Sequence, residues 1–564
     1  LSFTYDSADR RSVIRDAAGL EMRYLYDGAD RITTTKLPSG SQYTMDYDAN
    51  GNMISLSTPL NTTHEMEYDS VNQLVLYRDP LGKETLHAYD SALKRTSISY
   101  PSGRNEGMSY DANQRIAGVA YPSANLSFSY MPSSELPSGI QREPSGGGIP
   151  TTFTYDYDGS LPVSLTFSGD VTGQFTYDYD SDLLLSSIQL DSESPVSISY
   201  SQDGHLAGIG PFDVLRSQTS GLADSASDGV LQLEYAHDSS GRVTGRSYSI
   251  GDQLIYEYSI EHDVSGRLLA RTEAIGPTVR NFDYNYTPDE ALSTVSEDNN
   301  LVAEYQYDQN GNRINNALGD AISYDDADRV IAIGSAAYTH DNDGFMTQRS
   351  SDVFAYSVRG ELLNANVGGQ NVIYSYDGTG RRVARSQAGE IKEYFYGHPN
   401  ALFLLTHTRT KDGTITTYFY DEYGVLLGFD RAGVRYYVAV DQVGSPRLVI
   451  TQAGDIVREI EYGPWGEVIF DSNPSFDLDI GFAGGLTDWV TQHIRFGLRD
   501  YDPLSGRWMA SDPIGFEGGP NLYRFVGNNP IQYRDPMGLL CAGGEAFAGL
   551  GGGVELCYKD GKYS

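Results

Sequence analysis

The side chains in this sequence that could do chemistry are almost all carboxylates. The 564 residues include 76 Asp and Glu but only 9 His and 2 Cys. The histidines stand singly and form no HExxH motif, which argues against a zinc hydrolase. Paired carboxylates can hydrolyse a bond when one takes a proton from water and the other donates its own proton. The sequence therefore points to carboxylate chemistry or to none, and we expect no cofactor and no metal site.

The cysteines and the net charge narrow the class of protein further. Cys541 and Cys557 both lie in the last 24 residues, so the long body is stabilised without disulfides and holds no CxxC zinc site. With 40 basic and 76 acidic residues the net charge is −36, which repels phosphate and argues against nucleic-acid binding. No run approaches the roughly 18 apolar residues that cross a membrane, so we expect no membrane span.

Several loops resemble ligand-binding or catalytic motifs only superficially. The turn YDANGN at 47–52 lacks the bidentate Glu of a calcium loop. The glycine-rich stretches at 378–383 and 549–554 match neither the dinucleotide fingerprint nor the phosphate loop. The DTG and DSG elbows of ordinary aspartic proteases are absent. We interpret the segments 47–52, 378–383 and 549–554 as turns.

Many of the acidic residues belong to a strict repeat. In most units Pro stands 12 positions after a Tyr-Asp pair's Tyr and Gly or Asn stands 14 positions after it, as at Pro38 and Gly40. Variants of the motif continue to at least residue 390, so this is a repeat protein. The Tyr-Asp pairs recur every 21 residues, five times without slippage, at Tyr5, Tyr26, Tyr47, Tyr68, Tyr89 and Tyr110.

Each repeat unit is predicted to hold two strands and two turns. Stretches such as RITTTKL at 31–37 alternate β-branched and polar residues, as half-buried strands do. In the first turn the Asp can accept hydrogen bonds from N–H groups two residues on, and in the second the Gly or Asn supplies a left-handed residue. A helical apolar period is hard to find anywhere. We therefore predict an all-β protein with very little helix.

The repeat units must stack on their neighbours because one hairpin cannot bury its own face. Stacking builds a long spiralling sheet, and the periodicity fits a rod and a hollow shell equally well. Two segments rich in Ser, Gly and Pro, 132–150 and 217–229, are predicted to be surface loops or insertions. The chain enters in mid-pattern at LSFTYD, from which we expect a fragment of a longer parent chain.

The Tyr-Asp repeat, with its x-x-Gly-Arg continuation, resembles the YD-repeat or Rhs family, relatives of toxin-complex C subunits and teneurins. The most specific part lies at 435–539, where RYYVAVDQVGSPRLV, EYGPWGEVI, IRFGLRDYDPLSGRWMASDPIGF and NNPIQYRDPMGL follow in the order of the Rhs repeat-associated core. The resemblance implies a sheet that spirals into a hollow shell, or cocoon. In toxin members the shell holds a variable C-terminal polypeptide that is a cytotoxic effector.

The same resemblance implies an intramolecular aspartic protease that cuts just after the Leu of DPxGL. In this sequence the implied bond joins Leu539 and Leu540. The residues that match the family's motifs, and are therefore implied to be catalytic, are Asp512 as first choice, then Arg499, Asp500 and Asp488. The competing interpretation is structural, because an Asp in this sequence is usually a turn cap and Asp-Pro-x-Gly is itself a turn sequence.

The resemblance divides the chain into three parts. Residues 1–434 are the YD-repeat array that forms the shell wall, and 435–539 are the repeat-associated core with the implied autoprotease. Residues 540–564 shift abruptly to small, glycine-rich composition and are too short to bury a core of their own. We expect them to be the start of a variable C-terminal segment.

Together these observations lead to a function with two alternatives. The leading hypothesis is the shell of a polymorphic, Rhs-type toxin, secreted or at the cell surface and of bacterial origin. This shell would enclose its own C-terminal segment, release it by autoproteolysis and work with a delivery or capping partner. The first alternative is a secreted or cell-surface YD-repeat module for adhesion or carbohydrate binding, without proteolysis. The second is a plain structural stalk.

Overall fold

The computed structural model describes residues 1–539, Tyr558–Lys559 and Lys562–Tyr563, and this part of the chain is almost entirely β. One sheet runs from β1 (Ser2–Tyr5) to β29 (Asn300–Glu304), and a second runs from β30 (Ile322–Tyr324) to β45 (Val468–Asp471). Two short strands, β50 (Tyr558–Lys559) and β51 (Lys562–Tyr563), pair with each other. The helical elements of the described residues are three short 3₁₀ turns, η1 (Phe482–Gly484), η2 (Gly515–Gly518) and η3 (Val526–Asn528). The prediction of an all-β fold is confirmed.

The predicted repeat unit is present at full regularity in the first strands. After β3 (Glu21–Tyr26), Asp27 accepts hydrogen bonds from the backbone N–H of Ala29 at 2.8 Å and of Arg31 at 3.0 Å. The Arg31 Nε also donates to Asp27 Oδ2 at 2.7 Å. At the second turn, between β4 (Ile32–Lys36) and β5 (Gln42–Tyr47), Gly40 has φ of +97°. Both turn predictions are therefore confirmed.

Side chains of one unit tie directly to the next unit. The Arg31 guanidinium lies 4.8 Å from the ring of Tyr47, 16 positions on, and its Nη1 donates to the carbonyl of Asp48 at 2.8 Å. The Tyr47 hydroxyl donates back to the carbonyl of Ile32 at 2.8 Å. Since each Tyr-Asp-x-x-x-Arg turn is braced by the following one, a constant spacing of 21 residues keeps these contacts in register.

The two Ser/Gly/Pro-rich segments are not loops throughout, so that prediction was wrong in part. Residues 137–144 form β14 (Pro137–Pro144), and 223–227 form β22 (Ala223–Ser227). In β14 the side chains of Ile140 and Arg142 are buried while Gln141 between them is exposed, and Ile140 pairs with Phe128 of β13 (Ala124–Tyr130). The prolines stand at the ends of β14, where a missing N–H breaks no ladder hydrogen bond.

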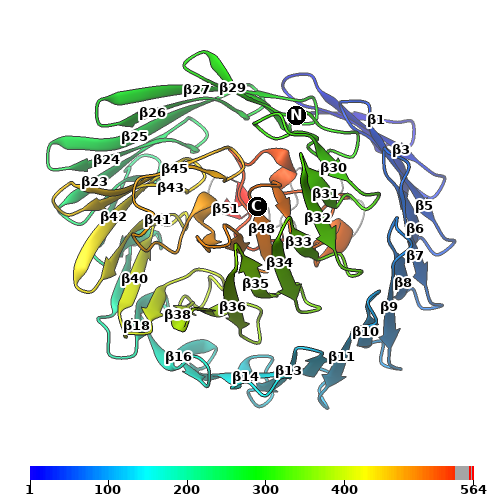
Figure 1. Cartoon of the computed structure of the whole chain (residues 1–564), viewed down its shortest axis with the longest axis horizontal. Coiled ribbons are helices and arrows are strands. Elements are labelled where there is room, and N and C mark those ends of the chain that lie inside the picture. The colour runs from blue at the N-terminus through cyan, green and yellow to red at the C-terminus, as the bar shows by residue number, and fades with distance from the viewer. Residues whose placement is uncertain (540–557, 560–561, 564) are drawn as a thin grey trace.

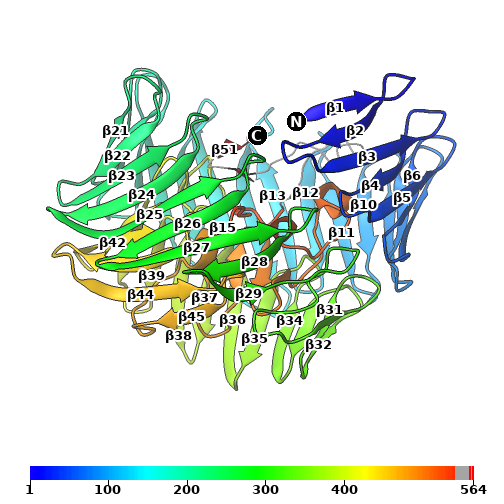
Figure 2. The same ribbon diagram turned by 90° about the horizontal axis from the view of Figure 1, so that it is seen from above.

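The two sheets form successive turns of one spiral wall. Figure 1 shows the strands passing around the molecule in chain order, and Figure 2 shows the strands from β30 onward below the first ones. Contacts between the turns link residues 250 positions apart at Ser39 and Asp289, 219 apart at Arg142 and Glu361, and 174 apart at Arg447 and Glu273. The spiral therefore tightens along the chain.

A seam of loops joins the two turns of the spiral. In this seam, the loops that hold the second β-turn of a repeat unit in the first sheet lie against loops of the Tyr-Asp type further along the chain. Ser39 N donates to Asp289 Oδ1 at 2.8 Å, and Leu60 N donates to Asn310 Oδ1 at 3.1 Å. Each acceptor stands three positions after the Tyr or His that begins its loop motif. Two further contacts of this kind join Ala18 to Ser265 and Ser102 to Asp343.

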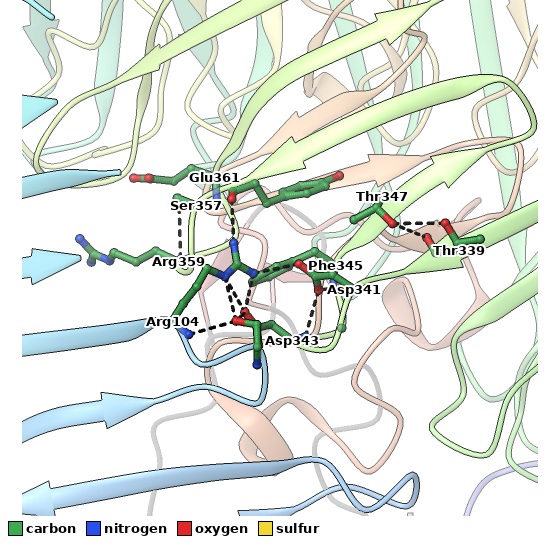
Figure 3. A network of polar contacts seen from close by, with 12 residues as sticks. Arg104, Thr339, Asp341, Asp343, Phe345, Thr347, Ser357, Arg359 and Glu361 are labelled. Atoms are coloured by element: carbon green, nitrogen blue, oxygen red, sulfur yellow. Dashed lines mark hydrogen bonds and ion pairs between the residues drawn. The ribbon is translucent and has the colours of Figure 1, made fainter. Parts of the chain in front are cut away.

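The contact at Asp343, drawn in Figure 3, has more hydrogen bonds and ion pairs than the other three contacts of the seam. Asp343 accepts from Ser102 N at 2.8 Å and from the Ser102 hydroxyl at 2.7 Å. Arg104 reaches across from the start of β11 (Asn105–Tyr110), and its Nε donates to Asp343 Oδ2 at 2.8 Å. Its Nη2 also pairs with Asp341 at 2.8 Å. The Asp343 side chain is fully buried, whereas about a quarter of the Arg104 side chain is exposed, so this ion pair is partly buried.

The equivalent loops of the first six units face solvent instead, and we call them the free rim. Four of the six side chains three positions after the Tyr are Ala or Val, which cannot accept a hydrogen bond. The residue type at this one position therefore differs between most rim loops and the seam loops. The six exposed rim residues are Ala8, Ala29, Asn50, Val71, Ala92 and Asn113.

The apolar core lies between the turns and around the terminal segment. The largest cluster combines Tyr248 and Tyr256 of the first sheet with Phe429 and Val438 of the second. After β45 the chain enters the ring of strands, where both views place the orange-to-red segment. No helix of the described residues is long and apolar enough to span a membrane.

The terminal segment builds a small sheet of its own inside the wall. It consists of β46 (Leu486–Thr487), β47 (Ile494–Phe496), β48 (Arg499–Asp502) and β49 (Arg507–Trp508). Its rings pack tightly, with the centroids of Tyr501 and Phe525 4.1 Å apart. Of the residues that the sequence singled out, Arg499 and Asp500 lie in β48, while Asp488 directly follows β46 and Asp512 lies after β49.

Candidate active site

Asp512 lies in the turn that follows β49 and is buried. Its Oδ1 accepts a hydrogen bond from Ile514 N at 3.1 Å, and its Oδ2 pairs with Arg499 Nη2 at 2.8 Å. Burial raises the pKa of Asp512 to about 6, against the opposing effects of the Arg499 charge and the Ile514 N–H. Asp512 therefore keeps its proton to a higher pH than an ordinary aspartate does.

Arg499, the first residue of β48, is the centre of the site. Its guanidinium carbon lies 4.1 Å from the ring centroid of Trp508, which holds it in place from one side. Its Nε donates to the carbonyl of Gly538 at 2.5 Å, and its Nη2 lies 3.5 Å from Asp535 Oδ2 as well as near Asp512. Arg499 thus joins two buried carboxylates to the end of the DPMGL segment.

Asp535 is the functional candidate that sequence reasoning missed. It is 2% exposed, and its Oδ1 accepts a hydrogen bond from Leu539 N at 3.1 Å. We interpreted DPMGL only as a turn and a cleavage signal, so its Asp was not considered for a catalytic role. The available signal was that both Asp512 and Asp535 open an Asp-Pro-x-Gly sequence, DPIG and DPMG. The structure brings the two together on Arg499.

Two glycines let the DPMGL segment lie directly against β47 and β48. Leu498 N donates to the carbonyl of Met537 at 3.0 Å. Gly497 has φ of +45°, and a Cβ there would lie 2.1 Å from the Met537 carbonyl oxygen. At Gly538, with φ of +66°, a Cβ would lie 2.4 Å from the carbonyl oxygen of Phe496. The chain up to Leu539 is therefore docked beside Arg499, while Leu540 and the rest of the predicted variable segment up to residue 557 lie outside the described residues.

Asp500 lies next to Arg499 in sequence but points into a different network. Its Oδ1 pairs with Arg382 Nη2 at 2.7 Å, and its Oδ2 pairs with Arg495 Nη1 at 2.8 Å. Arg382 begins β37 (Arg382–Gln387) of the wall. With both oxygens engaged by buried arginines, Asp500 is placed to fasten the terminal sheet to the wall.

Asp488 is held in a similar way. Its Oδ2 accepts hydrogen bonds from Tyr374 Oη and from Arg385 Nε, both at 2.7 Å. Burial alone would raise the pKa of Asp488, but the hydrogen bond and charge of Arg385 hold it below its ordinary value. A carboxylate that is ionised and fully hydrogen-bonded suits a structural anchor. The geometry thus brings together Asp512 and Arg499 of the four predicted residues, and places Asp500 and Asp488 against wall arginines.

No group of three or more His, Cys, Asp or Glu side chains in the described part of the chain could hold a metal ion. At Arg499 the guanidinium pairs with two carboxylates, Asp512 and Asp535. Such a pair can share a proton, because two buried carboxylates placed together do not easily both ionise. This is the arrangement that general acid and base catalysis by carboxyl groups requires.

Comparisons with known proteins identify relatives of the whole wall. A family profile described as Teneurin YD-shell matches residues 1–531. Teneurin-3 of Danio rerio is 33% identical over 363 residues, which are 60% of this chain and 13% of that protein. The chain thus spans about one seventh of the length of the curated relatives it matches.

Solved structures show the same fold at low sequence identity. The crystal structure of TcdB2-TccC3 matches with a TM-score of 0.74 and 16% identity over 95% of this chain and 34% of that chain. The Photorhabdus luminescens Tc holotoxin pore matches with a TM-score of 0.71 and 16% identity, over 95% of this chain and 33% of that one. The prediction of a YD-repeat shell is confirmed by these likenesses.

Proposed function

The chain belongs to the teneurin YD-shell family, and from that premise we propose that it encloses its own C-terminal segment and cuts that segment free after Leu539. One observation carries the proposal. Two buried carboxylates, Asp512 and Asp535, meet on Arg499, whose Nε also binds the carbonyl of the residue before Leu539. The bond to be cut therefore follows Leu539, the residue directly after Gly538, whose carbonyl is already held by Arg499.

In the proposed reaction water attacks the carbonyl carbon of Leu539 and the bond to the nitrogen of Leu540 breaks. Asp512 is assigned the role of acid, donating its proton to the leaving nitrogen of Leu540, because its raised pKa keeps that proton to about pH 6. Asp535 is assigned the role of base, taking the proton that water loses. Arg499 stabilises the ionised carboxylate and fixes the Gly538 carbonyl. Because the substrate is part of the same chain, proximity favours a single turnover even at a slow site.

Intact-mass measurement after denaturation tests the protease directly. Cleavage would separate a fragment of 25 residues, 540–564, from the rest of the chain. We expect the wild type to split, and Asp512→Asn to stay full length with unchanged thermal stability. Asp203→Asn, at an exposed loop carboxylate, is the matched control and should split like the wild type. A wild-type chain that stays intact after folding would rule the protease out.

We further propose that the enclosed segment is the variable part of a secreted or cell-surface toxin, as in the leading hypothesis from the sequence. The structural likeness to TcdB2-TccC3, a two-component assembly by its title, supports a shell that works with another subunit. The division of the chain into a shell wall (1–434), a repeat-associated core (435–539) and a variable segment (540–564) is part of this proposal. If the 25-residue fragment co-elutes with the shell under native conditions, encapsulation is supported. Immediate loss of the fragment would argue against it.

A second candidate function is a cell-surface module for adhesion or glycan contact, with no proteolysis. The teneurin relatives favour it, because their identity to this chain, 33% for Teneurin-3, is about twice that of the toxin structures. The mass measurement distinguishes the two candidate functions, because only the first predicts cleavage. An uncut chain that binds cells or a glycan array would support this second function.

A further inference from the structure

The loop that follows Asp512 is anchored on the opposite end of the chain. The ring of Phe516, in η2, lies 4.9 Å from the ring of His64 and 6.0 Å from that of Tyr77, both in edge-on arrangements. His64 belongs to β7 (Thr63–Tyr68) and Tyr77 to β8 (Leu74–Arg78) of the first turn of the wall. The contact therefore spans more than 400 residues of sequence.

The anchor on the wall is apolar and well defined. His64 is 4% exposed, its Nδ1 is hydrogen-bonded to the Tyr77 hydroxyl at 2.8 Å, and burial lowers its pKa to about 4. The ring is therefore neutral at physiological pH. Phe516 also packs against the buried cluster of Tyr43, Met45 and Leu56. This socket is built by residues of β5 to β8, which belong to the first turn of the wall.

The same short loop shapes the surroundings of Asp512. Gly515 N donates to the carbonyl of Asp512 at 3.0 Å, and Ile514 N donates to its carboxylate. At Gly518 a Cβ would lie 2.5 Å from Asp512 Oδ2, so the backbone of η2 presses directly on the carboxylate. The other charged groups facing Asp512 are Arg499 and Asp535. η2 thus packs against the carboxylate of Asp512 and contributes to its burial.

We propose that Phe516 is a positioning residue that couples completion of the first wall turn to assembly of the active site. The proposal rests on the proposed autoprotease. Before β7 and β8 are in place, Phe516 has no socket, η2 does not cover Asp512, and the carboxylate is open to solvent. Once the wall closes, the socket fixes η2 and the site becomes competent. Cleavage then follows closure of the shell, so the segment is cut only after it is enclosed.

The test follows cleavage of the full chain during pulse-labelled cell-free synthesis, with the chase at pH values from 5 to 8. We expect Phe516→Ala to slow cleavage by about tenfold to a hundredfold, the scale of a small misplacement of a catalytic group. We also expect the fall of the rate with pH to move below pH 6, because solvent access returns the pKa of Asp512 toward its ordinary value. Phe516→Leu should restore much of the rate.

Two controls separate positioning from loss of stability. Phe470→Ala, at an exposed ring of β45, should leave the rate and its pH dependence as in the wild type. His64→Ala should act in the same direction as Phe516→Ala, and the double variant should be no slower than Phe516→Ala alone, because both changes open the same contact. Thermal melts show which variants keep the fold.

The outcomes distinguish this inference from the proposed function. If the wild type is not cut, both fail together. If the wild type is cut and Phe516→Ala is cut at the same rate with the same pH dependence, only the inference fails. A slower Phe516→Ala with an unshifted pH profile would also overturn it, because general destabilisation then explains the loss.

Discussion

The repeated wall and the terminal segment use the same pair of residues, Asp and Arg, in opposite ways. In the wall, Asp27 and Arg31 are four positions apart, their contact is local, and about a quarter of each side chain is exposed. In the terminal segment, Asp500 pairs with Arg382 across 118 positions and both side chains are buried. The Asp-Arg pairs within the Tyr-Asp turns of the wall shape individual turns. The pair of Asp500 with Arg382 joins distant parts of the chain.

This difference decides where chemistry can arise. A local pair at the surface is solvated, and its Asp is held ionised by the adjacent Arg, as the lowered pKa of Asp27 shows. Inside the wall the carboxylates are buried, so the balance between burial and charged or hydrogen-bonding partners decides the charge state of each. Arg382 and Arg495 both pair with Asp500, whereas Asp512 pairs with Arg499, and there burial outweighs the charged partner and raises the pKa of Asp512. A buried carboxyl group of this kind keeps a proton that it can donate.

The largest expected effect is on cleavage when Asp535 is changed. We expect Asp535→Asn to reduce the cleavage rate by about a thousandfold or more, because the amide cannot take a proton from water. Intact mass after denaturation measures the product at fixed times. Asp263→Asn, which alters a partly buried Asp in a wall turn with its own Arg partner, should be cut normally. Rapid cleavage of Asp535→Asn would show that the missed residue only supports the DPMGL turn.

The next largest effect is on stability when an anchoring carboxylate is removed. Asp500→Ala leaves Arg382 and Arg495 buried without a counter-charge, which costs about 3 to 5 kcal/mol. Urea unfolding measures the loss, and Asp203→Ala, at an exposed loop, is the control with no expected change. A variant Asp500→Ala with wild-type stability but no cleavage would instead place Asp500 in the chemistry, as the sequence resemblance implied.

The pH dependence of cleavage tests whether Asp512 is the acid and Asp535 the base. Since Asp512 must carry a proton to act as the acid, the rate should fall about tenfold per pH unit above pH 6. The stability change has the same sign. A carboxyl whose pKa is raised in the folded state favours folding at low pH, and this contribution is lost as pH rises through about 6. A rate that climbs steadily from pH 6 to pH 8 would assign the acid role elsewhere.

A substitution in the seam between the turns of the spiral should lower the free energy of unfolding more than the equivalent substitution in the free rim. Asp343→Ala removes the partner of Ser102 N and of Arg104, so we expect a loss of about 2 kcal/mol in the free energy of unfolding. Asn113→Ala changes the equivalent position of an exposed rim loop and should have no measurable effect. Denaturant unfolding of both variants gives the comparison. Equal effects would mean that the side chain at this position does not hold the turns together.

The wall could be predicted from the sequence because its contacts are local and recur. Tyr47 ends a strand, Asp27 caps a turn and Gly40 takes a positive φ, and each of these follows from residue type and a spacing of 21. The choice between rod and shell could not be made this way. It depends on contacts such as Arg142 with Glu361, 219 positions apart, which no short-range pattern encodes.

The candidate site was predicted only in part for the same reason. Asp512 and Arg499 were named because their motifs resemble those of a known family, and the structure brings them together. Asp535 was overlooked because a turn sequence explained it completely. Asp500 was named from the same motif as Arg499, but neighbours in a strand point to opposite faces, so it meets Arg382 instead. Which face a residue takes becomes clear only when the partners across the sheet are known.

The smallest expected effect is at a single turn of the wall. Asp27→Ala removes the acceptor for the N–H groups of Ala29 and Arg31, but water can replace it because the turn lies at the surface. Arg31 keeps its contacts with the Tyr47 ring and the Asp48 carbonyl. In so large a protein we expect the melting temperature to fall by only about 1 °C, with cleavage unchanged. A fall as large as that of Asp343→Ala would mean that each local turn, rather than the long-range seam, limits the stability of the spiral.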